Sequence, residues 1–375
     1  MRFVSRERIV AVAIGQLPLP APVDAAARPA APYTRASACA GLRGWYAPMM
    51  GDRIGWLDTA RAIGIVAVVI GHFTSDPAVR AAMFHFHMPL FFMLSGIVFG
   101  TPAPARLIRR RAATLLLPYA AWLLVIALSD AAIAAVAGYQ AYLPWDHPPA
   151  ALARLLLGGT FLVAPFGIFW FVTCLFVTQI LAALLLRLPA RWLPATAAAA
   201  LAAALLMPAL PNPWGVISVP LALFFFLAGI LHHRHADRLG GPLTLAAIAL
   251  ALLAPLSRPL DLKVADAGTP LFSILAALGL CHLILLAARR LPRSPAIERL
   301  GQASLVIMYV HLTLYYALRD VLSAPLLVPL ALGLGVALWM LLDRFDATRW
   351  LMLGKTRPND SANRPVVPRL HHERA

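Results

Sequence analysis

Charged residues are scarce in this chain: only 13% of its 375 residues are Asp, Glu, Lys or Arg, and 61% are hydrophobic. Soluble domains carry about 25% charged residues, so the composition excludes an ordinary soluble protein and indicates an integral membrane protein. The three cysteines, Cys39, Cys174 and Cys281, are widely separated and lack metal-ligand spacing. We therefore expect neither a disulfide framework nor a metal site.

Lysine is nearly absent, since only Lys263 and Lys355 are lysines among 32 Lys and Arg residues, and the formal net charge is +16. A strongly basic chain raises the possibility of nucleic-acid binding. Here, however, the arginines fall in short runs between apolar segments, as is typical of cytoplasmic loops in membrane proteins. We therefore predict no nucleic-acid partner.

Apolar stretches of about 20 residues are long enough to cross a bilayer as helices. Ten such stretches are predicted, at residues 56–74, 84–100, 112–137, 167–186, 193–210, 215–231, 241–256, 269–288, 301–318 and 323–342. The expected fold is therefore an all-α polytopic integral membrane protein with about ten transmembrane helices.

The distribution of basic residues orients these helices. If the first helix starts in the cytoplasm, the internal loops and the tail carry 19 Lys and Arg residues, and the opposing loops carry five. An excess of this kind marks the cytoplasmic side, so both termini are predicted to be cytoplasmic. Arg61 is then the only Lys or Arg placed inside a predicted span.

The two ends of the chain differ from its hydrophobic middle. Residues 1–50 are rich in Ala, Pro and Arg and lack periodicity, which predicts a disordered extension. Either this extension is genuine or translation starts at Met49 or Met50. Residues 51–345 form the predicted membrane domain, and 346–375 form a polar cytoplasmic tail.

Arg61 and His72 lie in one hydrophobic segment, although both side chains are costly to place in hydrocarbon. Eleven residues of helix rotate by about 1100°, which returns His72 to within about 20° of Arg61, about 16 Å further along the axis. Asp58 precedes Arg61 by three residues and can pair with it. One helix face therefore carries an acid, a fixed cation and a titratable base, which predicts a functional site.

The second predicted span opens with His85 and His87 near its outer end, and His72 is expected in the outer half of the first span. Three histidines can therefore approach one depth from neighbouring antiparallel helices. Pro89 can bend the second span, and Ser95 lies deeper beside Gly96, where small residues allow helices to pack closely. A purely structural role stays open for His85 and for His87.

Two sequence elements together resemble the opening of the acyltransferase family 3 membrane proteins, which include O-acetylases of bacterial polysaccharides. They are W-L-D-T-A-R-x10-H at Trp56–His72 and F-H-M-P-L-F-F-M-L-S-G at Phe86–Gly96. A basic run at 106–111 and Phe169-Trp170-Phe171 also resemble family elements. The resemblance covers about residues 52–345.

A late segment resembles the family's G-x-x-S-x4-Y-x-x-H helix less closely. Gly301, Ser304 and Tyr309 match, but His311 follows the tyrosine by two residues and not three. The role of His311 therefore stays open.

The resemblance implies transfer of an acetyl or other short acyl group from cytoplasmic acyl-CoA to a hydroxyl of a carbohydrate, glycolipid or other cell-envelope acceptor. No permanently bound cofactor is expected, and the implied location is the inner membrane of a bacterium. The oligomeric state is not predicted. The residues expected to act are His72, Arg61 and Asp58 in catalysis, His85, His87, Ser95, Trp170, Ser304, Tyr309 and His311 in substrate binding, and Arg106, Arg109, Arg110 and Arg111 at the CoA phosphates.

Several roles stay open at this level. His72 can act as a general base toward the acceptor hydroxyl or carry the acyl group transiently. Arg61 can bind the donor or stabilise an oxyanion, and Asp58 can orient Arg61 or merely neutralise it. Positive-inside bias alone also explains the arginine run.

A different function class is a proton-coupled transporter or flippase in which Arg61, His72, His85 and His87 form a relay. No clear internal repeat supports it. A non-catalytic membrane partner would leave the costly polar face of the first helix unexplained. Turnover of acetyl-CoA, or thermal stabilisation by CoA, in detergent distinguishes an acyltransferase from a transporter and from a non-catalytic partner.

Overall fold

Helices dominate the part of the chain that the computed structural model describes, namely residues 55–100, 104–138, 140–207 and 210–355. Within these ranges there is no β-strand, only an isolated antiparallel bridge between Asp261 and Asp266. The all-α prediction is therefore confirmed. The predicted extension 1–50 and residues 356–375 of the tail lie outside the described residues.

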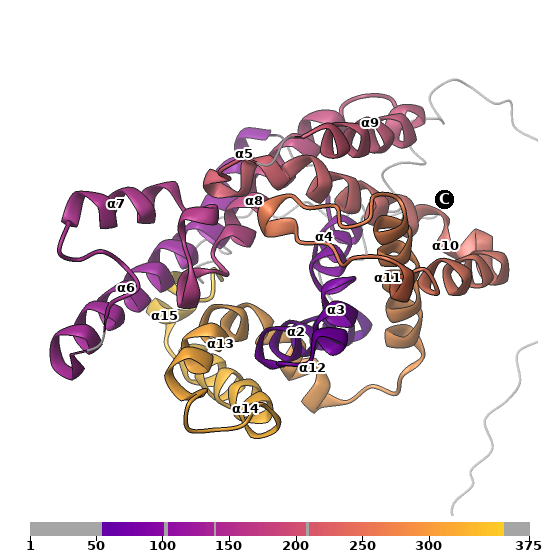
Figure 1. Cartoon of the computed structure of the whole chain (residues 1–375). Coiled ribbons are helices and arrows are strands. Elements are labelled where there is room, and N and C mark those ends of the chain that lie inside the picture. Colours follow the sequence, from indigo (N-terminus) through magenta and orange to yellow (C-terminus); the bar gives the residue numbers. More distant parts are fainter. Residues whose placement is uncertain (1–54, 101–103, 139, 208–209, 356–375) are drawn as a thin grey trace, which may run out of the picture. The chain divides into compact units, whose positions relative to one another are not determined.

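The helices follow one another with short connections (Figure 1). In chain order they are α2 (Gly55–Phe73), α3 (Pro77–Phe84), α4 (His87–Ile97), α5 (Pro104–Arg111), the π-helix η2 (Ala112–Leu116), α6 (Leu117–Ala137), α7 (Pro148–Leu157), α8 (Trp170–Leu185), α9 (Leu193–Leu206), α10 (Val219–Ala251), α11 (Phe272–Arg290), α12 (Pro295–Gln302), α13 (Ser304–Leu318), α14 (Ala324–Leu342) and α15 (Asp346–Leu351). Short 3-10 turns lie between some of them, including η4 (Ala164–Phe166).

Six helical stretches in the described ranges are long and apolar enough to cross a membrane. They are Gly55–Phe73, Ala105–Val136, Ala164–Leu185, Pro213–Leu256, Phe272–Arg290 and Ala324–Leu342. The chain is thus an all-α, multi-pass membrane protein. All ten predicted segments contain helix, but two of them share the stretch Pro213–Leu256 and others are short, so the count of ten stays a prediction.

The predicted span 84–100 is not one helix. Asp76 caps a separate helix, α3, by accepting hydrogen bonds from the backbone N–H groups of Ala78 (2.8 Å) and Val79 (3.2 Å). The chain then leaves helical geometry at Phe86 (φ −130°, ψ −23°) before α4 starts at His87. Because of this break, His85 ends one helix and His87 begins the next.

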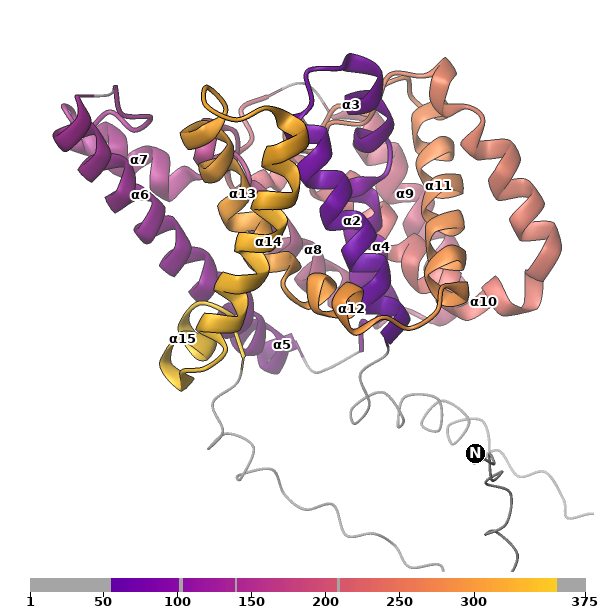
Figure 2. The same cartoon turned by 90° about the horizontal axis from the view of Figure 1, so that it is seen from below.

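Helix α10 is also broken. Gly240 adopts φ +44° and ψ −124° within it, and Pro242 follows. A positive φ is accessible to glycine at little cost, and proline cannot continue the hydrogen-bonding pattern of the preceding turn. The second arm of α10 therefore turns back along α11, as Figure 2 shows on the right.

The π-helix η2 follows the arginine run of α5 and precedes Pro118. Pro118 has no N–H to donate to the carbonyl of Thr114, so the regular ladder cannot be completed there. A single wider turn of this kind often occurs at functional sites.

Helix α2 lies at the centre of the packing and contacts α3, α4, α11, α12, α13 and α14. Glycines allow the closest approaches. A Cβ on Gly64 would meet the ring of Phe91 at 3.1 Å, and one on Gly96 or Gly229 would overlap the facing backbone of α10 or α4. This packing surrounds α2 and so fixes the surroundings of Arg61 and His72.

Candidate functional site

The N-terminal end of α2, here called the inner end because it is predicted to face the cytoplasm, holds an ion pair. Arg61 Nη1 donates to Asp58 Oδ1 at 2.8 Å, and Gln302 Nε2 donates to Asp58 Oδ2 at 3.1 Å. The side chain of Asp58 is 6% exposed and that of Arg61 is 36% exposed. Both oxygens of the buried carboxylate therefore have partners, while the guanidinium keeps access to its surroundings.

Gly301 brings α12 against this pair. A Cβ at Gly301 would overlap the backbone carbonyl of Asp58, so only glycine fits at this crossing. Figure 2 shows α12 beside the start of α2, at the edge opposite α3. The late G-x-x-S element thus positions Gln302 next to Asp58.

Three histidines meet at the other end of α2. The ring centroid of His72 lies 5.2 Å from that of His311 and 6.1 Å from that of His87. His87 and His311 are buried, whereas His72 is half-buried. Phe84 packs against two of the rings, 5.4 Å from His72 and 4.7 Å from His87. Helices α2, α4 and α13 thus converge on one histidine cluster.

The ring tautomers in this cluster follow from backbone contacts. The Nδ1 atoms of His72, His87 and His311 lie 2.8 Å from the carbonyl oxygens of Val68, Met83 and Met308, respectively. A carbonyl oxygen only accepts, so each Nδ1 carries the hydrogen and donates it. In a neutral ring, Nε2 then has a free lone pair, which is the arrangement that a base or a nucleophile requires.

The Nε2 of His311 is buried and has no hydrogen-bond partner among the described residues. An unsatisfied buried nitrogen is costly unless a substrate or a proton donor reaches it. Within residues 55–100, 104–138, 140–207 and 210–355, no group of three or more His, Cys, Asp or Glu side chains is placed to hold a metal ion.

Comparison with known protein families assigns the chain. The family model described as an acyltransferase domain, that of acyltransferase family 3, matches residues 54–344. The chain belongs to acyltransferase family 3. No curated protein and no solved structure matches it significantly.

His85 does not join the histidine cluster of this acyltransferase. Its Nδ1 lies 2.6 Å from the carbonyl oxygen of Ala81, and its Nε2 lies 3.1 Å from Ser257 Oγ. Both ring nitrogens therefore have partners within the protein. The helix break at Phe86 separates His85 from His87, and this separation is the reason that only one of the two reaches His72.

The remaining residues that resemble acyltransferase elements lie in varied surroundings. Ser95 Oγ donates to the carbonyl oxygen of Phe91 in its own helix at 2.8 Å. Trp170 is buried at the start of α8, and Ser304 is half-buried at the start of α13. None of these contacts places the three side chains at the histidine cluster.

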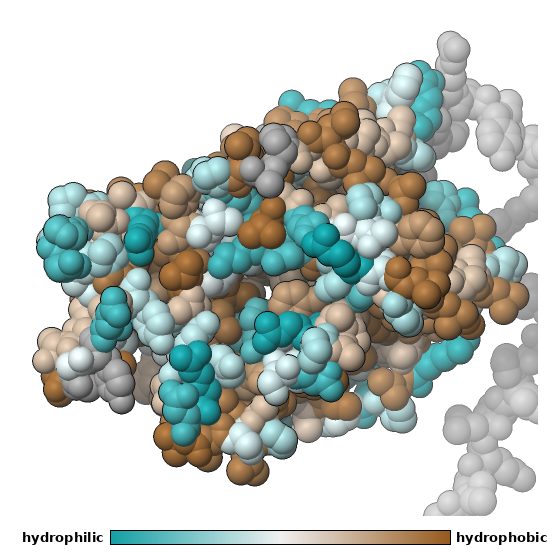
Figure 3. Space-filling view, viewed as in Figure 1, coloured by the Kyte–Doolittle hydropathy of each residue, from teal (hydrophilic) through white to brown (hydrophobic). Residues whose placement is uncertain are grey.

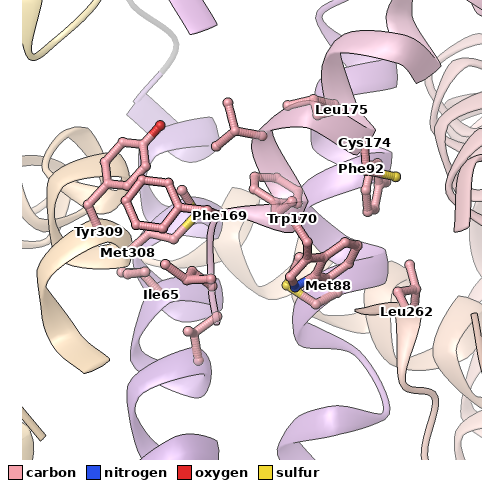
Figure 4. Packing of buried hydrophobic residues seen from close by; sticks show 14 of the residues in the cluster. Ile65, Met88, Phe92, Phe169, Trp170, Cys174, Leu175, Leu262, Met308 and Tyr309 are labelled. Atoms are coloured by element: carbon pink, nitrogen blue, oxygen red, sulfur yellow. The ribbon is translucent and has the colours of Figure 1, made fainter. Parts of the chain in front are cut away.

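Tyr309 lies in the aromatic core of the acyltransferase. Its ring stacks on Trp122 at 5.7 Å and lies 5.2 Å from Phe169. Figure 4 shows its hydroxyl pointing away from the Phe169 ring. Like His311 Nε2, which lies on the same helix α13, the hydroxyl is buried without a hydrogen-bond partner among the described residues.

The basic run of the acyltransferase lies on α5. Arg106, Arg109 and Arg110 are exposed, and Arg111 is half-buried with an Nε that has no partner among the described residues. This arginine run ends where the π-helix η2 begins. Because α5 carries several guanidinium groups on one short helix, it is suited to binding phosphates.

Sequence reasoning missed Lys263, although it is one of only two lysines. Its Nζ donates to the carbonyl oxygen of Leu162 at 3.0 Å, and burial lowers its pKa. A Cβ on Gly167 would lie 3.3 Å from this Nζ and 3.6 Å from Leu312, the residue after His311.

Figure 3 shows the face of the molecule that carries α3, where hydrophilic side chains gather toward the middle and hydrophobic ones along the lower edge. His72 lies in the last turn of α2, at the end that leads into α3.

Proposed function

We propose that the protein is a membrane-embedded O-acyltransferase of the bacterial inner membrane. It transfers an acetyl or other short acyl group from cytoplasmic acyl-CoA to a hydroxyl of a carbohydrate, glycolipid or other cell-envelope acceptor. The observation that carries this proposal is the histidine cluster, in which Nδ1–H bonds to backbone carbonyls leave Nε2 lone pairs at the end of α2 that also carries α3.

His72 is the proposed catalytic base. Its Nε2 takes the proton of the acceptor hydroxyl, the oxygen attacks the thioester carbonyl, and the carbon–sulfur bond breaks. CoA leaves as the thiolate and is then protonated. In the two-step version, Nε2 attacks the thioester itself and releases CoA, and the acceptor oxygen then displaces the imidazole. Both versions use the same lone pair.

Arg61 is proposed to act on the donor. Eleven helical residues separate it from His72 by about 16 Å along the axis, too far for one guanidinium to contact an oxyanion formed beside His72. The pairing with Asp58 instead holds Arg61 at the predicted cytoplasmic end, where acyl-CoA is available. Lys263 is better placed to stabilise negative charge at the reacting carbonyl, because a Cβ on Gly167 would contact both its Nζ and Leu312, the residue after His311.

The donor phosphates are proposed to bind the α5 arginines, Arg106, Arg109, Arg110 and Arg111. Tyr309 OH and His311 Nε2, which are both buried without a partner among the described residues, are proposed substrate contacts together with His87. His85 bonds to Ala81 and Ser257 and lies outside the histidine cluster, so it does not join His72 and His87 in the relay that a proton-coupled transporter would need.

The test compares His72→Ala with His147→Ala in cells. His147 is an exposed histidine whose side chain is 78% accessible, so it is a matched control outside the cluster. Acetyl groups on surface glycans are measured by mass spectrometry in a deletion strain that carries each variant. We expect acetylation to be lost with His72→Ala and kept with His147→Ala. Normal acetylation by a correctly inserted His72→Ala protein would contradict the proposal.

A further inference from the structure

A pocket of about 530 Å³ lies between the break in α10 and the end of α11, remote from the histidine cluster. Its volume falls in the range of small-molecule sites, about 300–1,000 Å³. It lies at the helix ends that lead into the predicted cytoplasmic loops 232–240 and 289–300. None of the roles discussed so far uses this pocket.

The pocket results from the turn in α10. Past Gly240, the second arm packs so closely on α11 that a Cβ on Gly279 would lie 2.5 Å from the carbonyl oxygen of Ala247. At the other end of this arm, a Cβ on Gly240 or Gly241 would meet nothing within 4 Å. The arm is thus closed against α11 at one end and open at the other, where the pocket forms.

Positive charge predominates in the lining. Arg289 and Arg290 come from the end of α11, and the acidic group in the lining is Asp237. Asp237 Oδ1 accepts from Arg289 Nη1 at 3.1 Å, but a guanidinium offers five N–H donors. One carboxylate therefore neutralises one of the two arginines and leaves a net positive charge.

Two histidines in the wall form a pair. His232 Nε2 and His282 Nδ1 lie 2.9 Å apart, which requires one hydrogen between them. His232 Nδ1 is buried without a partner among the described residues, and His282 Nε2 lies 3.4 Å from Thr244 Oγ1. In the neutral pair, one hydrogen lies between the rings and the other lies on one of the two outer nitrogens. The pair can thus present one N–H donor to an anion.

We infer that this pocket binds a phosphate monoester or diester, with Arg289 and Arg290 neutralising its charge and the His232–His282 pair donating to its oxygens. Arginine suits phosphate because its planar fork binds two oxygens at once. The volume exceeds that of a bare phosphate ion, so the ligand carries a further group.

Arg289 connects the pocket to the helix that bears Arg61. Its guanidinium carbon lies 4.5 Å from the centre of the Trp56 ring, at the start of α2. A phosphate bound to Arg289 is therefore held next to α2. The same chemistry is offered by two cytoplasmic sources. One is the nucleotide end of CoA, which rests on the proposed function and would extend the donor site beyond the α5 arginines, and the other is the head group of an inner-leaflet phospholipid.

The test measures binding by calorimetry to the purified full chain in a maltoside detergent without phosphate. One arm uses adenosine 3′,5′-bisphosphate, and the other uses short-chain phosphatidic acid in mixed micelles. We expect one probe to bind, and Arg290→Gln and His282→Gln each to weaken it by about tenfold through loss of a charge-assisted or donor contact. The probe that binds identifies the source.

Two exposed residues outside the lining serve as matched controls, Arg238→Gln for the arginine and His233→Gln for the histidine. Both should bind like the wild type. Arg290 is exposed, so its variant keeps the test valid if His282→Gln fails to fold. Binding of neither probe, or equal binding by pocket variants and controls, would overturn the inference. The assay needs no acyl transfer, so its outcome is separate from that of the proposed function.

Discussion

The polar side chains at the two ends of α2 are stabilised in an apolar helix by different interactions. At the inner end, Asp58 and Arg61 neutralise each other, and Gln302 satisfies the remaining carboxylate oxygen. At the outer end, His72, His87 and His311 are neutral when each carries only its Nδ1 hydrogen. His72 and His311 donate it to a carbonyl of their own helix, and His87 donates it to the carbonyl of Met83 in α3.

This difference suggests that one end of α2 positions a substrate and that the other end reacts with it. A fully paired charge is held in place and changes little, whereas an imidazole with a free Nε2 can gain a proton or form a bond. The inner end is therefore suited to holding a donor, and the outer end is suited to the chemical step.

The largest effect is expected from removing the reactive nitrogen. His72→Gln should lower kcat for acetyl transfer by about 10²–10⁴-fold, the usual contribution of a general base, with little change in KM for acetyl-CoA. Arg61→Gln should instead act mainly on that KM. Steady-state kinetics of purified variants measure both. The reverse pattern, or equal effects on both constants from both variants, would break the division between the two ends.

Gly301→Ala should destabilise the inner end by about 1–3 kcal/mol, because the new methyl group overlaps the carbonyl of Asp58 and must push α12 away. Gly333→Ala in α14 is the control, since a Cβ there meets nothing within 4 Å. Alanine in an open helical position should be neutral or stabilise by up to about 1 kcal/mol. Thermal unfolding in detergent compares the two, and equal melting temperatures would refute the close packing.

Asp58→Asn should lower the free energy of unfolding by about 1 kcal/mol, because it leaves Arg61 without its counter-charge while keeping the shape of the side chain. The value is modest because the Arg61 side chain is 36% exposed to solvent. Adding Arg61→Gln should restore part of the loss. A double variant that is less stable than Asp58→Asn would argue against a simple neutralising pair.

The smallest expected effect concerns Lys263 and pH. Burial lowers the pKa of Lys263 below its ordinary value of 10.5, so the unfolded chain binds more protons than the folded one just below that pH. Stability therefore rises with pH across this window. The melting temperature of the wild type minus that of Lys263→Gln should therefore increase as the pH rises from about 8 toward 10. A constant difference would mean that Lys263 keeps its ordinary pKa.

Local patterns in the sequence predicted most of the helices and the polar face of α2. The spacing of Asp58 and Arg61 also predicted their pairing. The break at Phe86 was missed because the residues on both sides are apolar, and the cap that starts α3, Asp76, lies well before it. His85 was consequently grouped with His87.

Contacts between distant segments could not be predicted from spacing. His311 reaches His72 only because α13 packs on α2, and Gln302 reaches Asp58 only because Gly301 permits the crossing of α12. Lys263 offered a compositional signal, since lysine is so rare here, but its approach to Gly167 depends on how the loop after α10 folds back. The pocket at His232 likewise depends on the turn at Gly240.

The close crossing of α4 and α10 at Gly96 and Gly229 also affects how the protein is made. Chains fold from the N-terminus as they are synthesised, so α2 and α4 enter the membrane before α10 exists. The backbone of α4 can pack on α10 only after more than 100 further residues have been synthesised. The histidine cluster is complete only when α13 is present, more than 200 residues beyond His87. The reactive end of the molecule is therefore assembled late during biosynthesis, when most of its surrounding helices are already in place.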